Sequence, residues 1–310
     1  MFHPAQVAGA VEGFYLKMKI GLIDADGHNF PNLALMKIAS FHRRNGDTVE
    51  WVNIGNYDIT YISKVFTFSP EPSLRLGNYG KIIRGGTGFH SYETLKPEID
   101  ILCPDYSIYP KTTAAYGFLT RGCVNNCSWC IVPRKEGDIV AYSDIEDWLN
   151  EKKEAIIMDN NILAHEHGIS QLEKVLKLGI KIDINQGIEA RLISPEIAQL
   201  LSKIKFIRFL RMACDTKAAI PYIESAVKNL SKYGVKPYRV FCYVLVKDVE
   251  DALYRIKYLH KLGVTPFAQP YRDFTTNTFP TLETRDLARW CNHRAIFKSC
   301  DFRDYRPRKR

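Results

Sequence analysis

The stretch from Gly117 to Ile131 reads GFLTRGCVNNCSWCI and holds three of the chain's eight cysteines. Cys123, Cys127 and Cys130 are spaced C-x3-C-x2-C, with a tryptophan directly before the third cysteine. Thiolates are preferred ligands of iron–sulfur clusters, and a four-iron cluster takes four of them. A loop with three cysteines would leave one iron open to another molecule. The spacing therefore predicts a cluster site with one open position.

A structural zinc site is the alternative interpretation of the same loop. Cys103 or a histidine would then supply the fourth ligand. Structural zinc sites usually combine two short pairs such as C-x2-C and H-x3-5-H. The sequence has no second pair of this kind, so the spacing favours the cluster.

The composition is that of an ordinary globular protein, with 310 residues, 46% hydrophobic and 25% charged. No apolar run reaches the length of a membrane span, and the N-terminal residues lack the pattern of a signal peptide. We therefore expect a cytoplasmic protein without a membrane partner. In that compartment cysteines stay reduced, and a cysteine cluster is more often metal-binding or catalytic than disulfide-bonded.

The formal net charge is +9, and the last ten residues, DFRDYRPRKR, contribute five basic and two acidic side chains. A basic excess interleaved with aromatic residues suits a polyanionic partner such as nucleic acid. A solvated, frayed terminus explains the tail equally well.

The first hundred residues alternate between apolar runs and a helical pattern. Apolar runs predict strands over residues 19–26, 48–54, 59–68 and 81–88, and helical spacing predicts a helix over 32–44. Such alternation is typical of a doubly wound parallel sheet. We expect this domain over residues 1–100, followed by a linker over 101–115.

From residue 116 the alternation becomes more regular. Strands are predicted over 117–123, 155–161, 181–187, 206–215, 238–246 and 266–273, with helices over 170–179, 194–204, 219–234, 249–263 and 282–297. Six strand–helix units make a partial (β/α)6 TIM-like barrel, expected over residues 116–280. A C-terminal helix and basic tail over 281–310 would follow. In such barrels the chemistry lies at the carboxyl ends of the strands.

The cysteine spacing, placed after the first of six barrel units, resembles the signature of the radical S-adenosylmethionine (SAM) superfamily. The resemblance implies a [4Fe-4S] cluster held by Cys123, Cys127 and Cys130, with SAM chelating the fourth iron. It also implies an enzyme that cleaves SAM to a 5′-deoxyadenosyl radical, and an electron donor such as flavodoxin or ferredoxin.

The resemblance also assigns SAM contacts at the strand ends. Asp159, Asn160 and Asn161 occupy the position where the family hydrogen-bonds the SAM amino group, although a turn or helix cap would use the same residue types. Asn185 and Gln186 end the third strand and are further candidates.

Two arginines lie in the predicted fourth strand, Arg208 and Arg211. Arginine is costly in a buried strand unless it faces the barrel lumen or a charged ligand. In the family a basic residue here often meets the SAM carboxylate, and Arg211 is the choice nearer the carboxyl end. An ion pair of Arg211 with Asp215 or Glu189 is the alternative.

The N-terminal segment Asp26-Gly-His28-Asn-Phe-Pro31 resembles the D-x-H-x-x-G loop of cobalamin-binding domains, with proline in place of the final glycine. Ser63 and the later pair Gly85-Gly86 follow in the family's order. The resemblance implies a cobalamin-binding-like fold, and His28 as the cobalt ligand if cobalamin binds.

The leading hypothesis is a radical SAM enzyme, with a nucleic-acid base or nucleotide as the first substrate to consider. A cobalamin-dependent radical SAM methyltransferase is one alternative. The other is a non-catalytic, zinc-stabilised nucleic-acid-binding protein, which would be colourless and would not cleave SAM. Tyr271 or Cys242 could donate a hydrogen atom to a product radical in the enzyme.

Overall fold

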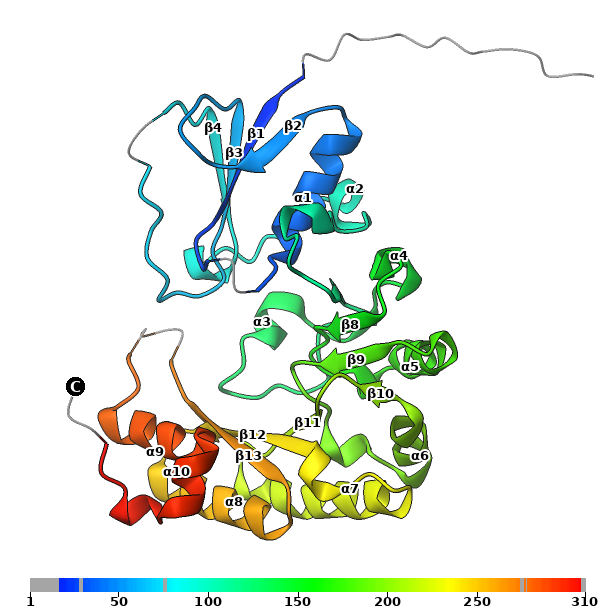
Figure 1. The fold of residues 1–310 in the computed structure, drawn as a ribbon, viewed down its shortest axis with the longest axis vertical. Coiled ribbons are helices and arrows are strands. Elements are labelled where there is room, and N and C mark those ends of the chain that lie inside the picture. Colours follow the sequence, from blue (N-terminus) through cyan, green and yellow to red (C-terminus); the bar gives the residue numbers. More distant parts are fainter. Residues whose placement is uncertain (1–16, 28–29, 75–76, 274–275, 277, 308–310) are drawn as a thin grey trace, which may run out of the picture. The chain divides into compact units, whose positions relative to one another are not determined.

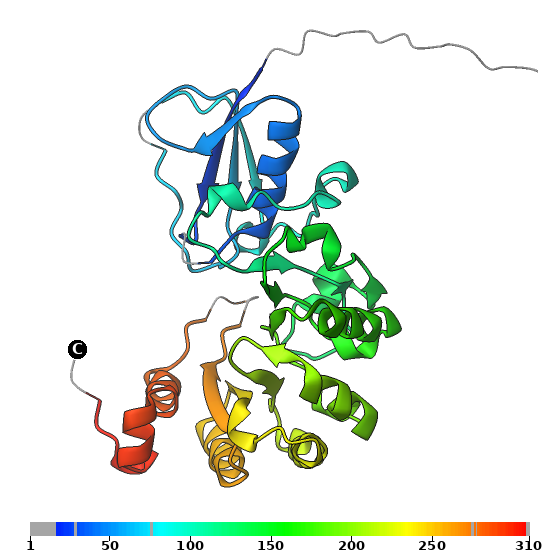
Figure 2. The same cartoon turned by 45° about the vertical axis from the view of Figure 1, so that its right-hand side comes forward.

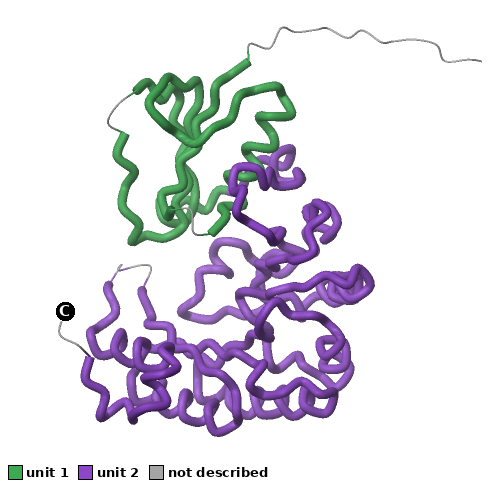
Figure 3. Tube along the Cα trace, viewed as in Figure 1, with its two compact units in different colours: residues 1–93 green, residues 94–310 purple. Residues whose placement is uncertain are grey.

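The computed structural model of the protein describes residues 17–27, 30–74, 77–273, 276 and 278–307. The chain separates into two compact units, Met1–Glu93 and Thr94–Arg310, coloured separately in Figure 3. Both units are mixed α/β, and the main sheets of both are parallel. His28, the predicted cobalt ligand, lies outside the described residues.

The N-terminal unit is built on a four-stranded sheet with the order β2-β1-β3-β4 (Figure 1). Its elements are β1 (Lys19–Asp24), α1 (Leu33–Arg44), β2 (Thr48–Trp51), β3 (Ile59–Ser63), β4 (Lys81–Gly85) and the 3-10 helix η1 (Thr87–Phe89). Helix α1 begins at Asn32, whose side chain accepts a hydrogen bond from the backbone of Leu35. The predicted parallel sheet is confirmed. Among the described residues, no helix follows β2 or β3 before the next strand, so α1 is the long helix of this unit, at the place predicted for it.

The C-terminal unit contains two parallel sheets. One has the order β10-β9-β8-β5 and the other β11-β12-β13. The strands are β5 (Ala115–Gly117), β8 (Glu154–Ile157), β9 (Lys181–Ile184), β10 (Lys205–Phe206), β11 (Leu210–Ala213), β12 (Val240–Val246) and β13 (Thr265–Pro270). One parallel bridge between Ile188 and Met212 connects the segment after β9 to β11.

Helices α5 to α8 line one side of these sheets (Figures 1 and 2). The longer helices are α5 (Glu166–Leu178), α6 (Pro195–Lys203), α7 (Ile220–Lys232), α8 (Val249–Lys261), α9 (Leu282–Asn292) and α10 (Arg294–Ser299). The short ones are α2 (Pro97–Asp100), α3 (Val132–Glu136), α4 (Glu146–Leu149), η2 (Tyr106–Ile108), η3 (Ile162–Ala164), η4 (Ala190–Leu192), η5 (Lys217–Ala219), η6 (Pro237–Arg239) and η7 (Phe302–Asp304). The predicted last helix is therefore two helices separated at His293.

Two predicted strands are each divided in the structure. The first sheet strand ends at Gly117, because the next backbone N–H groups, of Leu119 and Thr120, donate to the Asp159 carboxylate instead of a strand. A separate strand β6 (Thr120–Arg121) then pairs antiparallel with β7 (Val140–Ala141). The predicted fourth strand is β10 and β11, which pair with different neighbours, and Arg208 lies between them.

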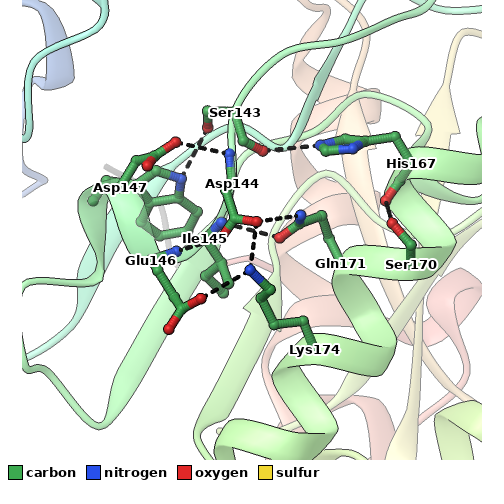
Figure 4. Close-up of polar contacts among 10 residues, drawn as sticks. Ser143, Asp144, Ile145, Glu146, Asp147, His167, Ser170, Gln171 and Lys174 are labelled. Atoms are coloured by element: carbon green, nitrogen blue, oxygen red, sulfur yellow. Dashed lines mark hydrogen bonds and ion pairs between the residues drawn. The ribbon is translucent and has the colours of Figure 1, made fainter.

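A polar network ties the segment after β7 to helix α5 (Figure 4). The Asp144 carboxylate accepts hydrogen bonds from Gln171 Nε2 at 2.9 Å and Lys174 Nζ at 2.6 Å. The Gln171 side-chain oxygen accepts from the backbone of Ile145 at 3.0 Å. The Ser143 hydroxyl donates to the carbonyl of Phe118 at 2.6 Å. The segment that carries the cysteines begins near Phe118 and ends near Ser143. These bonds join its two ends to each other and fix the second end against helix α5.

Candidate functional site

The cysteine loop, residues 122–131, is closed at its base by Glu136. One oxygen of this carboxylate pairs with Arg121 at 2.9 Å, and the other accepts from the backbone of Gly122 at 3.2 Å. The Glu136 side chain is only 7% exposed. Gly122 has φ +84°, and an added Cβ would lie 2.1 Å from the carbonyl oxygen of Asp138, so only glycine fits here. The loop is therefore anchored at both ends.

All three cysteines of the loop are free thiols, with Cys123 and Cys127 half-buried and Cys130 exposed. Cys123 Sγ accepts from the backbone of Asn125, and Cys130 Sγ from the backbone of Val132, both at 3.4 Å. Burial raises the pKa of the Cys127 thiol, and the nearby Cys130 and Cys123 raise that pKa further. The three sulfur atoms thus lie within electrostatic reach of one another.

In the described part of the chain, no group of three or more histidine, cysteine, aspartate or glutamate side chains is arranged to hold a metal ion. The three loop cysteines are therefore not drawn together as a preformed metal site in the described chain, either by themselves or with Cys103 or a described histidine. What the loop does offer is three thiols on one segment, two of which accept backbone N–H bonds. Thiols are the donor type that iron–sulfur clusters prefer, so the chemistry of this donor set fits such a group.

Glu189 joins the loop to the ends of β8 and β9. Its Oε2 accepts from Asn161 Nδ2 at 2.5 Å and from Asn125 Nδ2 at 2.8 Å. Arg191 forms an ion pair with Glu189 and donates to Asn125 Oδ1 at 2.8 Å. Asn161 Nδ2 also lies 3.8 Å from Cys123 Sγ. Sequence analysis missed Asn125 and treated Glu189 only as a partner of arginine, although both are polar residues on or beside predicted strand ends.

Two amide oxygens at this site are buried without a hydrogen-bond partner among the described residues, Asn161 Oδ1 and Asn185 Oδ1. A buried acceptor without a donor costs free energy, and in native structures it usually marks a missing partner. The Asn161 amide cannot simply reverse, because its nitrogen donates to Glu189. A ligand that carries N–H groups would satisfy both oxygens.

Asp159 is fully buried and directed toward the start of the loop. Its oxygens accept from Leu119 N at 2.8 Å, Thr120 N at 2.6 Å and Thr120 Oγ at 2.6 Å. Burial raises the pKa of Asp159 to about 6, and the bonds from Thr120 and Leu119 oppose that rise. The neighbouring Asn160 donates to Glu136 at 2.8 Å. Of the three predicted residues, Asn161 is the one with a hydrogen bond to a cysteine sulfur.

The Arg211 side chain forms an ion pair with a residue of β9. Its guanidinium makes two 2.6 Å bonds to Asp183 on β9 and a 3.1 Å bond to the Tyr243 hydroxyl. The Tyr243 hydroxyl in turn donates to the Asn185 carbonyl at 2.9 Å. This geometry favours the ion-pair interpretation of Arg211, with Asp183 in place of the partners that we expected. Gln186 is exposed in the turn after β9.

A second cation lies at the carboxyl end of β12. Lys247 Nζ is 4.8 Å from the ring centre of Trp129 in the cysteine loop and 4.4 Å from that of Tyr271, directly after β13. Burial raises the pKa of Asp215, which follows β11, and Arg255 and Lys247 partly offset that rise. Sequence analysis missed Lys247, although it follows the predicted fifth strand directly.

Together, the ends of five parallel strands contribute side chains around the cysteine loop. Asn161 follows β8, Glu189 follows β9 and Asp215 follows β11. Lys247 and Tyr271 follow β12 and β13. The charge of Asp215 raises the pKa of both Cys127 and Cys130, so β11 also ends near the thiols.

The cobalamin-like motif of the N-terminal unit has local structural partners. The Asp26 carboxylate accepts from the backbone of Val65 at 2.5 Å and from the Ser69 hydroxyl at 2.6 Å. Ser63 Oγ accepts from an asparagine side chain. Gly86 has φ +103°, and an added Cβ would lie 2.3 Å from the Lys64 carbonyl oxygen, so the backbone itself requires glycine. The described residues of this motif therefore each have a role in the local structure of the N-terminal unit.

A search of protein-family models found no match for this chain, and neither did a search of curated proteins. In the described residues, no helix combines the length and apolar character that crossing a membrane requires.

Proposed function

We propose that the protein is a radical SAM enzyme that binds a [4Fe-4S] cluster through Cys123, Cys127 and Cys130. The observation that carries this proposal is the position of the three free thiols against the carboxyl ends of five parallel strands. Parallel α/β folds place their chemistry at that edge.

The strand order supports a partial (β/α)6 barrel. Strands β5, β8 and β9 lie side by side in chain order, as do β11, β12 and β13, and all are parallel. The Ile188–Met212 bridge joins the two sets in the same order. We infer that the two sheets form one curved wall with the helices on its outer side.

The chain's own residues would hold and shield the cluster. Cys123, Cys127 and Cys130 would ligate the cluster, while the bonds of Glu136 to Arg121 and Gly122 would keep the base of the loop fixed. Backbone N–H bonds to sulfur, already present at Cys123 and Cys130, would continue to stabilise the thiolates. When bound and reduced by an electron donor such as flavodoxin or ferredoxin, a cluster of this kind supplies the electron that cleaves SAM to a 5′-deoxyadenosyl radical.

The SAM contacts that we propose differ from the sequence-based set. Asn161 Oδ1 and Asn185 Oδ1 are acceptors suited to the SAM ammonium group, since neither has a hydrogen-bond partner in the part of the chain that the structure describes. Lys247 is a better candidate than Arg211 for the SAM carboxylate, because the Arg211 guanidinium is already bonded to Asp183. Asp159 would act on the loop, not on SAM.

The test is anaerobic reconstitution of the full chain with iron and sulfide, followed by reduction, addition of SAM and chromatography for 5′-deoxyadenosine. We expect a brown protein that forms this product, and loss of both properties in Cys127→Ala. Asn161→Ala should keep the cluster and lose SAM cleavage, whereas Arg211→Lys should keep both. A colourless protein that binds zinc and forms no product would refute the proposal.

A nucleic-acid base or nucleotide is the substrate class that we propose first. The formal net charge of +9 would attract a polyanion, and Lys247 and Arg191 are exposed at the edge that carries the cysteine loop.

A further inference from the structure

One face of β12 and β13 is open while the other is covered. Along β12, buried residues alternate with half-buried ones, and the half-buried set is Phe241, Tyr243 and Leu245. On β13 the positions on the same face are Phe267, half-buried, and Gln269, exposed. We call these five residues the inner face. Strands packed on both faces bury both sets of side chains, so this pattern indicates an accessible surface.

The register makes the inner face continuous. Tyr243 pairs with Phe267 and Leu245 pairs with Gln269, so their side chains are direct cross-strand neighbours. On the other side of Tyr243 stands Ala213 of β11, which is itself exposed. Ala213 has only a methyl side chain, so it does not cover the Tyr243 ring beside it.

Aromatic rings dominate the part of this face farther from the cysteine loop. The ring centres of Phe241 and Phe267 are 5.2 Å apart with planes inclined by 34°, and those of Tyr243 and Phe267 are 6.0 Å apart at 88°. Beside them, the Arg211–Asp183 pair spans the two sheets. Phe209 stacks on the Phe241 ring, and the Arg211 guanidinium lies 5.1 Å from the centre of that ring. Tyr243 and Phe267, both half-buried, are therefore the rings of this face that a further planar group would contact.

Polar groups border the rings. The Gln269 side chain is exposed on the same face of the strand as Phe267, while the Gln269 backbone pairs with Leu245 of β12. The backbone carbonyl of Asn185 accepts a hydrogen bond from the Tyr243 hydroxyl, which fixes the orientation of that ring. An exposed amide beside aromatic rings suits a ligand that is planar and has donors and acceptors on its edge.

We propose that the inner face binds a nucleobase of the substrate, with Phe267 and Tyr243 contacting the ring and Gln269 bonding its edge. Aromatic side chains bind bases of any sequence by stacking, and glutamine amides bond base edges. This inference rests on the proposed function, since it specifies which substrate that site takes.

The test measures binding separately from catalysis. Fluorescence anisotropy at fixed salt would follow short labelled single-stranded RNA and DNA, and mononucleotides as competitors, on the full chain before and after reconstitution. Phe267→Leu and Gln269→Leu should each weaken binding, Phe267→Leu by about tenfold. Tyr238→Leu and Gln199→Leu change an exposed tyrosine and an exposed glutamine elsewhere and should leave binding unchanged.

S-adenosylhomocysteine binding distinguishes the substrate base from the adenine of the cofactor. The inference predicts unchanged affinity for this molecule in Phe267→Leu and Gln269→Leu. An equal loss there would overturn the inference, because the inner face would then hold the cofactor's own base. Absence of any oligonucleotide or nucleotide binding by the native chain would also overturn it. Base binding that depends on Phe267, in a chain that never cleaves SAM, would support the inference and refute the proposed function alone.

Discussion

Replacing Asp159 with asparagine should change how the stability of the protein depends on pH. Burial raises the pKa of this carboxyl from 3.8 to about 6 in the folded chain. Each pKa unit corresponds to about 1.4 kcal/mol, so the shift amounts to about 3 kcal/mol. Because the folded-state pKa is the higher one, the stabilisation is fully present below the unfolded pKa and is lost as pH rises through about 6.

The assay is urea unfolding of the native chain and Asp159→Asn, followed by tryptophan fluorescence at several values between about pH 4 and pH 7. All other titrating groups are common to both chains, so the difference between their free energies of unfolding isolates Asp159. We expect the stability of the native chain, relative to the variant, to fall by about 2.4 kcal/mol over this range, because part of the total of about 3 kcal/mol is already lost at pH 4, above the unfolded pKa of 3.8.

Asp304→Asn, at an exposed position, is the matched control and should show no such trend. A difference that stays flat or rises with pH would refute the reasoning. It would mean that the three donors from Leu119 and Thr120 outweigh burial and hold the pKa of Asp159 at or below its ordinary value.

Three further substitutions test the packing and the site. Arg211→Met should lower the free energy of unfolding in urea by about 3 kcal/mol, because it leaves the largely buried Asp183 carboxylate unpaired. Adding Asp183→Asn should recover most of that loss. Equal losses in the single and double variants would contradict the ion-pair reasoning. Gly117→Ala should lower the melting temperature and reduce the free energy of unfolding by about 1–3 kcal/mol, since the new Cβ would lie 2.4 Å from ring carbons of Trp148. An unchanged melting temperature would show that the ring can move away. Cys127→Ala should lose most of its bound iron after reconstitution with little change in its urea midpoint before reconstitution, and full iron content in the variant would contradict the ligand assignment.

Much of the parallel architecture follows from local sequence. Apolar runs and helical spacing predicted most strands and long helices of both units within a few residues. Helix starts were readable because Asn32, Ser194 and Asp248 accept hydrogen bonds from the first turns of α1, α6 and α8. The failures are the two divided strands. Their apolar character is continuous, and only the change of hydrogen-bonding partner, which is a tertiary property, ends one strand and begins the next.

The site was predictable to the level of the cysteine loop and the strand ends. Within 159–161, sequence alone could not say which side chain turns toward the thiols, because that depends on where Leu119 and Thr120 place their N–H groups. Arg211 was assigned to a ligand because its partner, Asp183, lies 28 positions away on β9. Only tertiary packing brings β9 and β11 close together, so no spacing rule in the sequence reveals the pairing of Arg211 with Asp183.

The cysteine loop contacts both parallel sheets of the C-terminal unit across the boundary between them, which we call the seam. Among the described residues, backbone pairing between the two sheets is limited to the Ile188–Met212 bridge. The loop contacts both sides of this seam, through Glu189 on one side and Lys247 on the other. A cluster bound in the loop would therefore tie both halves of the unit together. Loss of iron should therefore weaken the contact between the two sheets first. An increase in the rate of proteolytic cleavage around Ile188 would then report oxidative damage to the cluster without an assay of catalysis.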